Sequence, residues 1–212
     1  EREELRLDLE KIGKVKRRVI EVEAPTAKPV VERFSGIGIG PEEIQRSMLR
    51  VGEALAGEEP EVAHIDLLIG KKDGPVGAAF AQAKAAPALG HEPLLAIIEP
   101  NLAVKPPTLL VPTVSIKGMR DASLVYGPAQ AGAAKAVVDS VADGTIPQAA
   151  LDDIVIIANI FVHPAAVDRK RVYINNYKAM RHAVRRAVEG WPTPDELIEN
   201  KERAKHPFKY TP

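Results

Sequence analysis

The sequence predicts an α+β fold, in which helices pack on a mixed β-sheet. Two observations lead to this expectation. Strand-like and helix-like segments are mixed along the chain, without the strict alternation that builds a parallel α/β sheet. The chain has 212 residues, of which 45% are hydrophobic, so it can bury a core without disulfide or metal support.

Four segments have the composition of strands. The first contains alternating apolar residues and precedes the turn sequence Lys71-Lys72-Asp73-Gly74-Pro75, and the last is a continuous apolar run that stops at His163-Pro164. Prolines confine the loop between the second and the third. The expected strands are residues 62–69, 94–98, 108–116 and 154–162.

Four segments have the composition of helices. The second is rich in alanine and is followed by Gly144, a residue that often ends helices. The third is basic and amphipathic. The expected helices are residues 76–86, 129–142 and 166–189, with a last helix after Pro192-Thr193-Pro194.

The first 50 residues differ from the rest because they are rich in charge and interrupted by prolines. Apolar spacing predicts a short helix over residues 2–12 and a strand over 15–23. The glycine-rich stretch 36–40 precedes a helix start at Pro41, an arrangement that can bind phosphate. It lacks a preceding buried strand and the usual phosphate-loop spacing, so we favour a connector. Residues 1–46 are therefore expected to form an N-terminal extension of unknown role, separate from a domain over 47–212.

Composition excludes several classes of function. Lys and Arg number 29 and Asp and Glu number 29, so no net charge attracts nucleic acid or an anionic membrane. No apolar run reaches the roughly 20 residues of a membrane helix, and the charged N-terminus is unlike a secretory signal. Cysteine is absent, which fits a reducing compartment. We expect a soluble, cytoplasmic protein.

The histidines do not indicate a metal site. None is spaced as a compact pair of ligands, and no cysteine thiolate is available to complete a set. We therefore expect no bound metal. The five histidines are His64, His91, His163, His182 and His206.

His64 and Asp66 are the candidates for proton transfer. Alternation along the strand 62–69 places Ala63, Ile65 and Leu67 on one face, so His64 and Asp66 share the other. An imidazole titrates near neutral pH and a neighbouring carboxylate can tune it, which suits a proton-transfer pair. A merely exposed polar face explains the same pattern.

Gln130 lies at the expected start of the helix 129–142. Free backbone N–H groups and a side-chain amide at such a position can hydrogen-bond a heterocycle. Ordinary helix capping explains the residue equally well.

A series of motifs in the same order resembles the formaldehyde-activating enzyme family of methylotrophs and methanogenic archaea. The resemblance runs from Val51 to Phe208, roughly three quarters of the chain, and makes 47–212 the formaldehyde-activating enzyme domain. The motifs are Gly52-Glu53-Ala54-Leu55, Glu61-Val62-Ala63-His64-Ile65-Asp66-Leu67, Asp73-Gly74-Pro75-Val76-Gly77, Pro100-Asn101-Leu102, Lys105-Pro106, Gly127-Pro128-Ala129-Gln130 and Asp139-Ser140-Val141-Ala142-Asp143-Gly144.

The resemblance implies a hydro-lyase of one-carbon metabolism. Members condense formaldehyde with tetrahydromethanopterin, a co-substrate, and release water without a metal. It also implies a fold like the second domain of small-subunit ribosomal protein five, in a homopentameric ring with sites between subunits. By resemblance His64 is the catalytic acid, and Asp66, Leu95 and Gln130 bind the pterin.

Two further positions of the family's substrate site carry different residues here. Where members usually have lysine-valine-threonine, this chain has Thr113-Val114-Ser115. Ser115 keeps the hydroxyl, whereas Thr113 loses the charge and the reach of lysine. An alternative therefore stays open: a non-catalytic or altered-specificity paralogue, acting as a pterin- or formaldehyde-binding ring or as a scaffold.

Overall fold

The computed structural model describes residues 49–205, and a mixed five-stranded sheet is its centre. The strand order is β1-β2-β7-β6-β3. Neighbouring strands are antiparallel except β6 and β7, which run parallel. A separate antiparallel pair is formed by β4 and β5. The strands are β1 (Arg50–Ala56), β2 (Ala63–Lys71), β3 (Leu94–Leu95), β4 (Ile97–Glu99), β5 (Leu102–Ala103), β6 (Thr108–Pro112) and β7 (Ile154–Val162).

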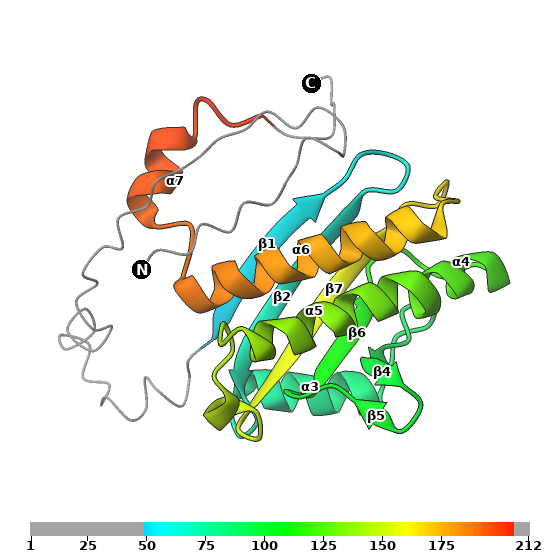
Figure 1. Cartoon of the computed structure of the whole chain (residues 1–212), viewed down its shortest axis with the longest axis horizontal. Coiled ribbons are helices and arrows are strands. Elements are labelled where there is room, and N and C mark those ends of the chain that lie inside the picture. Colours follow the sequence, from blue (N-terminus) through cyan, green and yellow to red (C-terminus); the bar gives the residue numbers. More distant parts are fainter. Residues whose placement is uncertain (1–48, 206–212) are drawn as a thin grey trace. The chain divides into compact units, whose positions relative to one another are not determined.

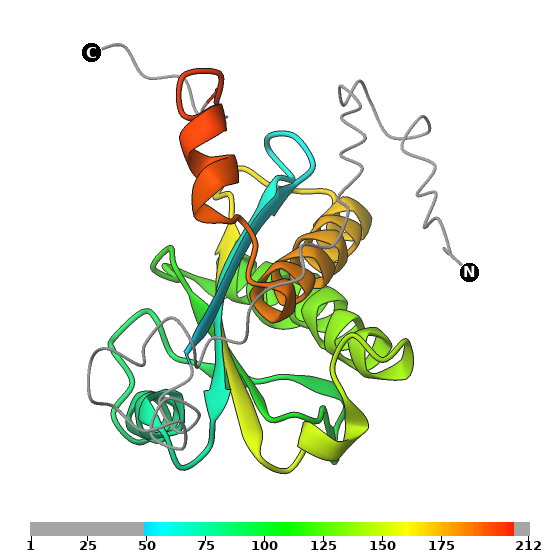
Figure 2. The same ribbon diagram turned by 90° about the vertical axis from the view of Figure 1, so that its left-hand side faces the viewer.

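Two long helices cover one face of this sheet. Figure 1 shows α5 and α6 side by side on it, and Figure 2 shows α3 on the opposite side. The expected α+β architecture, a mixed sheet with helices packed on it, is therefore confirmed. The helices of the described range are α3 (Pro75–Ala85), α4 (Met119–Leu124), α5 (Gln130–Ala142), α6 (Arg169–Glu189) and α7 (Pro194–Asn200), with a π-helix η2 (Val125–Ala129) and a 3₁₀ turn η3 (Gln148–Ala150).

Alternation along β2 and β7 divides the residues between the two faces. The face under α5 and α6 holds Ile65 and Leu67 of β2, paired in register with Ile160 and Ala158 of β7, and all four are fully buried. The opposite face is covered at one end by α3, whose Val76 packs in a small cluster with Val155 and Ile157 of β7. The other end of that face carries His64 and Asp66, which are only partly buried.

Two glycines allow α6 to pack closely. An added Cβ atom at Gly52 of β1 would lie 2.0 Å from the carbonyl oxygen of Ala183 on α6. At Gly132 of α5 it would lie 2.3 Å from the carbonyl oxygen of Tyr173, also on α6. Both atoms are backbone, so they cannot move aside cheaply. Glycine at these positions brings α6 against the sheet and against α5.

Several expected elements are confirmed and others differ. Strands 62–69 and 154–162 and helices 76–86, 129–142 and the last helix are present within one or two residues. Helix 166–189 begins only at Arg169, because the side chain of Asp168 caps it by accepting from the backbone N–H groups of Lys170 and Arg171. Strand β1 was not among the expected elements. The predictions for 2–12, 15–23, 36–44 and His206 lie outside the described residues.

Two expected strands are shorter than predicted. Residues 108–116 stop being a strand at Pro112; beyond Thr113 the chain leaves the sheet, and Ile116 donates to the carbonyl of Gly90 at 2.9 Å. Residues 94–98 divide between two sheets. The backbone N–H of Ala96 still donates to the carbonyl of Thr108 on β6. The carbonyl of Ala96, however, accepts from the N–H of Val104, so the residues after Ala96 belong to the β4–β5 pair.

The first prediction tests the close approach at Gly52. Gly52→Ala should lower the free energy of unfolding by at least about 1–3 kcal/mol, because the new methyl group overlaps the Ala183 carbonyl. Gly118→Ala is the matched control, since a Cβ there meets nothing within 4 Å. Urea denaturation of both variants measures the difference. Equal midpoints for Gly52→Ala and the wild type would show that α6 has room to move away.

The second prediction concerns an ion pair between α5 and α6, formed by Asp143 and Arg181. Burial acts to raise the pKa of Asp143, but hydrogen bonds from Arg181 and Thr145 outweigh it and hold the pKa at about 2, below the ordinary 3.8. Between these values the unfolded chain binds more protons than the folded chain. The stabilisation is therefore present above about pH 4 and is lost as the pH falls toward 2.

Asp143→Asn should accordingly flatten the dependence of the thermal midpoint on pH between about 5 and 2. Asp73→Asn, which removes an exposed carboxylate from the turn after β2, is the control and should keep the wild-type slope. If Asp143→Asn kept that slope too, the ion pair would contribute nothing to acid sensitivity.

Candidate active site

A patch of polar residues lies on the sheet face opposite α5 and α6. His64 and Asp66 alternate with buried residues on β2, so both side chains belong to this face. Their neighbours in register are Leu55 and Glu53 on β1, and Phe161 and Asn159 on β7. The His64 side chain is 36% exposed, which leaves it accessible to a small molecule. We call Glu53, His64, Asp66 and Asn159 the polar patch.

His64 has a carboxylate partner from the neighbouring strand. Its Nε2 atom lies 2.9 Å from Oε1 of Glu53. A carboxylate at this distance accepts a hydrogen bond from the ring N–H and orients the ring. Glu53 stands in the motif Gly52-Glu53-Ala54-Leu55 but was not among the expected site residues, because the contact depends on strand β1 and its register, which were not predicted.

The same carboxylate is contacted from α6. Arg186 Nη1 lies 3.6 Å from Glu53 Oε2 and donates to the Glu53 backbone carbonyl at 2.5 Å. Its guanidinium also stacks on Trp191, 4.5 Å from the ring centroid. Glu53 therefore lies between two cationic groups when His64 is protonated, and Arg186 fixes its position.

Asp66 has an unused acceptor. Its Oδ1 atom is buried and makes no hydrogen bond with the described residues. A buried carboxylate oxygen without a donor is costly, and such atoms are commonly satisfied by a ligand or an ordered water. This arrangement suits the binding of an N–H group next to His64.

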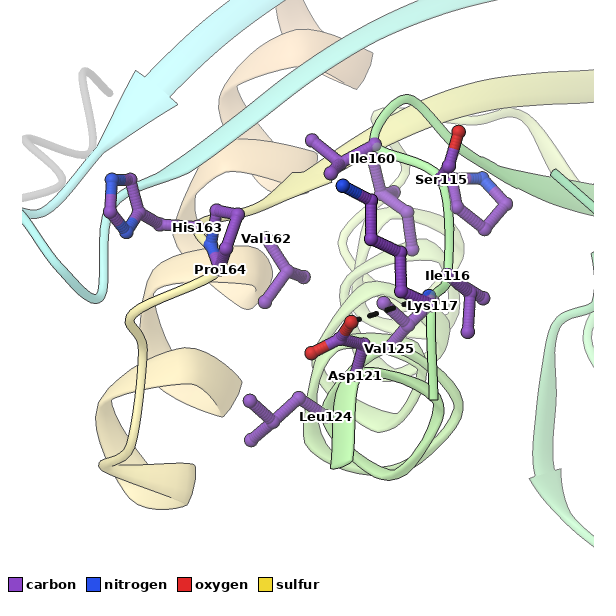
Figure 3. A pocket seen from close by; sticks show the side chains of 12 residues that line it. Ser115, Ile116, Lys117, Asp121, Leu124, Val125, Ile160, Val162, His163 and Pro164 are labelled. Carbon is purple, nitrogen blue, oxygen red and sulfur yellow. Dashed lines mark hydrogen bonds between the residues drawn. The ribbon is translucent and has the colours of Figure 1, made fainter. Parts of the chain in front are cut away.

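A cavity of about 100 Å³ opens at the same end of the sheet, where β6 and β7 end. Figure 3 shows Ser115 and His163 on opposite sides of the cavity. Leu124 of α4 and Val125 of η2 also line it. Its wall includes Ile160 and Val162, which belong to the sheet face under α5 and α6. The cavity thus lies across the sheet from the polar patch.

Thr113 and Ser115 follow β6 at this end. The Thr113 hydroxyl donates to the carbonyl of Ile160 at 3.2 Å, and its backbone N–H donates to the same oxygen at 3.0 Å. Ser115 lines the cavity, and its hydroxyl lies 2.8 Å from Nε2 of His91. Thr113 therefore supports the sheet end, while Ser115 faces the cavity.

Leu95 and Gln130 lie at the other edge of the sheet. Leu95 is in edge strand β3, paired with Leu109. Gln130 is buried, and its Oε1 accepts the backbone N–H of Ile97 at 2.9 Å. Three strand spacings separate β3 from β2, about 14 Å. One chain therefore brings His64 together with Asp66, but it does not bring Leu95 or Gln130 beside them.

The expectation of free N–H groups at Gln130 was wrong. Helix α4 and the π-helix η2 lead directly into α5, so Gln130 is inside a continuous helical segment and not at its start. Pro128 is in the π-helical turn, and the wider hydrogen-bonding ring tolerates it there.

Within residues 49–205 no three His, Asp or Glu side chains are grouped so that they could hold a metal ion. No helix in that range combines the length and the apolar character needed to cross a bilayer.

Comparison with known proteins gives consistent matches. The sequence model of the formaldehyde-activating enzyme (Fae) family matches residues 51–209. Over 159 residues the chain is 52% identical to the bifunctional enzyme Fae/Hps of Methanococcoides burtonii, covering 75% of this chain and 40% of that protein. Over 158 residues it is 53% identical to the 5,6,7,8-tetrahydromethanopterin hydro-lyase of Methanosarcina barkeri, covering 74% of this chain and 89% of that protein. The chain thus spans about two fifths of the bifunctional relatives and most of the hydro-lyase.

Proposed function

The chain belongs to the formaldehyde-activating enzyme family, and we propose that it condenses formaldehyde with tetrahydromethanopterin to methylene-tetrahydromethanopterin and water. The observation that carries this proposal is the polar patch. There His64 lies 2.9 Å from the Glu53 carboxylate, and Asp66 offers a buried oxygen without a donor. A candidate acid, its carboxylate partner and a candidate binding group thus lie on one face of the sheet.

The condensation needs an acid at one step. An amine nitrogen of the reduced pterin attacks the formaldehyde carbon and gives a hydroxymethyl adduct. Because Nε2 of His64 is bonded to Glu53, the ring gives the proton of its other nitrogen, Nδ1, to the hydroxyl oxygen, the C–O bond breaks and water leaves. The resulting iminium ion is closed by the second pterin nitrogen, which loses a proton. General acid catalysis of this kind contributes typically about 10²–10⁴-fold.

The neighbouring carboxylates fit this chemistry. Glu53 stabilises the protonated His64 and holds the ring in place. Asp66 accepts an N–H of the pterin and stabilises the cationic iminium by charge. The reaction uses the pterin as a co-substrate and needs no resident metal. The protein would be a lyase of cytoplasmic one-carbon metabolism, as in methanogenesis or methylotrophy.

The remaining binding residues favour a site shared between subunits. Leu95 is on β3, about 14 Å from β2 within one chain, and Gln130 on α5 is bonded to Ile97 just beyond that strand. A neighbouring copy in a ring would bring its own Leu95 and Gln130 to the polar patch, together with Thr113 and Ser115. We therefore propose a homopentamer of subunits with the fold of the second domain of small-subunit ribosomal protein five. Residues 1–46 would be an extension outside the catalytic domain 47–212.

One observation favours a second candidate function. Thr113 stands where relatives usually carry lysine, and its hydroxyl already donates to Ile160. A paralogue with altered pterin specificity, or a non-catalytic binding or scaffold ring, would need no cation at this place. His64 and its carboxylate partner favour the enzyme, because a scaffold has no use for an acid.

The third prediction tests the proposed acid. His64→Ala should lower turnover by well over tenfold with little change in pterin affinity, since the lost interaction belongs to the transition state. Glu53→Gln keeps an acceptor but removes the charge, so its loss of turnover should be smaller, and Glu58→Gln in the β1–β2 turn is the matched control. Steady-state formaldehyde consumption at saturating pterin measures all three. Wild-type turnover in His64→Ala would remove His64 from the mechanism.

The fourth prediction concerns Thr113. Thr113→Lys should strengthen tetrahydromethanopterin binding by roughly 10–150-fold, the equivalent of one hydrogen bond from a charged group. The rate at saturating pterin should stay nearly the same, because His64 is untouched. Thr113→Ala, which loses only the bond to Ile160, controls for local structure. Titration of each protein with the pterin measures the affinity. Weaker binding by the lysine variant than by the wild type would favour the altered-specificity paralogue.

The fifth prediction concerns assembly. Deleting residues 1–46 should leave a folded, active ring of five, because the proposed catalytic domain starts beyond this segment. Light scattering and the turnover assay check it on both the deleted and the full chain. An active monomer at micromolar concentration would contradict the shared site, and an insoluble deletion would place core residues before 47.

A further inference from the structure

His91 connects two groups at the rim of the cavity. Its ring lies in the loop before β3, with Nδ1 2.7 Å from the backbone carbonyl of Pro112 and Nε2 2.8 Å from the hydroxyl of Ser115. The two segments are joined by a backbone hydrogen bond, from Ile116 to the carbonyl of Gly90 at 2.9 Å. The ring is therefore held at both nitrogens between fixed partners.

These partners determine where the ring carries its proton. A carbonyl oxygen can only accept, so Nδ1 must be the protonated nitrogen. In a neutral ring Nε2 is then an acceptor, and the Ser115 hydroxyl donates to it. The Ser115 oxygen is left with lone pairs only, so toward the cavity it can accept a hydrogen bond and cannot donate one.

We propose that His91 is a positioning residue that makes Ser115 an acceptor for ligand N–H groups, and that protonation of His91 reverses this role. A protonated ring carries hydrogen on both nitrogens, so Nε2 donates to Ser115 and frees the hydroxyl hydrogen for the ligand. The inference rests on the proposed function, since a reduced pterin presents several ring N–H groups. Neutral His91 thus favours this ligand and protonated His91 disfavours it.

The ionisable groups around Ser115 come from several elements: Glu92 and Tyr126 lie beside the His91 ring, and His163, Lys117 and Asp121 line the same cavity. Hydrogen bonds from the backbone N–H groups of Glu92 and Gly90 lower the pKa of the Glu92 carboxyl, which stays ionised near neutral pH. From η2, the Tyr126 phenol donates to the Glu92 carbonyl, and burial raises the pKa of Tyr126, which stays neutral. From the end of β6 come the Pro112 carbonyl and the Ser115 hydroxyl, neither of which ionises in this range. Imidazole side chains change charge between about pH 5 and 8.

The test is the affinity for tetrahydromethanopterin as a function of pH, measured by anaerobic titration without formaldehyde. In the wild type, binding should weaken by about 2- to 12-fold from pH 8 to pH 5.5, the worth of one neutral hydrogen bond. In His91→Gln the pterin affinity should change much less between pH 8 and pH 5.5, because the glutamine amide donates to Pro112 and accepts from Ser115 at every pH. This variant should also keep the high-pH affinity, which a merely damaged loop would lose. Ser115→Ala should also lose this pH dependence, and it should bind the pterin more weakly at every pH because the acceptor hydroxyl is gone.

Two controls separate the possible failures. His182→Gln on α6, away from the cavity, should keep the wild-type pH dependence. Nitrogen-15 NMR of the free protein should show His91 protonated at Nδ1 above neutral pH. An Nε2–H ring, or equal pH dependence in wild type and His91→Gln, would overturn the role of His91 alone. Absence of pterin binding at any pH in the wild type, with the Nδ1–H ring observed, would overturn the proposed function instead.

Discussion

The packing of α6 directly against the sheet is the constraint on which the rest of the structure depends. Gly52 and Gly132 remove the side chains that would hold α6 away from β1 and α5. The sheet face beneath these helices is then almost entirely apolar, and its buried Thr108 hydroxyl has a partner in the Pro106 carbonyl, because a polar group cannot be placed there without one. Polar residues of β1 and β2 must therefore occupy the alternate positions, which face the other way. The chemistry of the chain follows from this division of the two faces.

Much of this division could be predicted from the sequence, because alternation is a local property. The pattern around His64 and Asp66 was sufficient to place both on one face of a strand, and the apolar run of β7 fixed its bounds. Glu53 could not be found in this way, since its contact with His64 depends on the register of a neighbouring strand. The true surroundings of Gln130 were missed for a similar reason: the π-helical turn before it joins two helices that local composition separates.

The two halves of the candidate site differ in how they are held. His64 and Asp66 are on a central strand bonded on both sides, so their backbone has little freedom. Thr113 and Ser115 follow a short strand and depend on side-chain bonds, to Ile160 and His91. Connecting segments of this kind generally vary more in sequence than strands do, and no strand alternation fixes the side chains of the second half.

The outer edge of β1 has a consequence for how copies of the chain can associate. An edge strand exposes backbone groups that another strand can pair with, which invites sheet extension and aggregation. Here the Arg186 guanidinium donates a hydrogen bond to the backbone carbonyl of Glu53 on β1. The Arg50 side chain, also on β1, donates to the carbonyl of Val188 on α6. A second chain that added a strand at this edge would have to displace a guanidinium that is also stacked on Trp191. Self-association through a continuous sheet is thereby opposed at β1, so side chains and not backbone groups are what this edge offers to another copy.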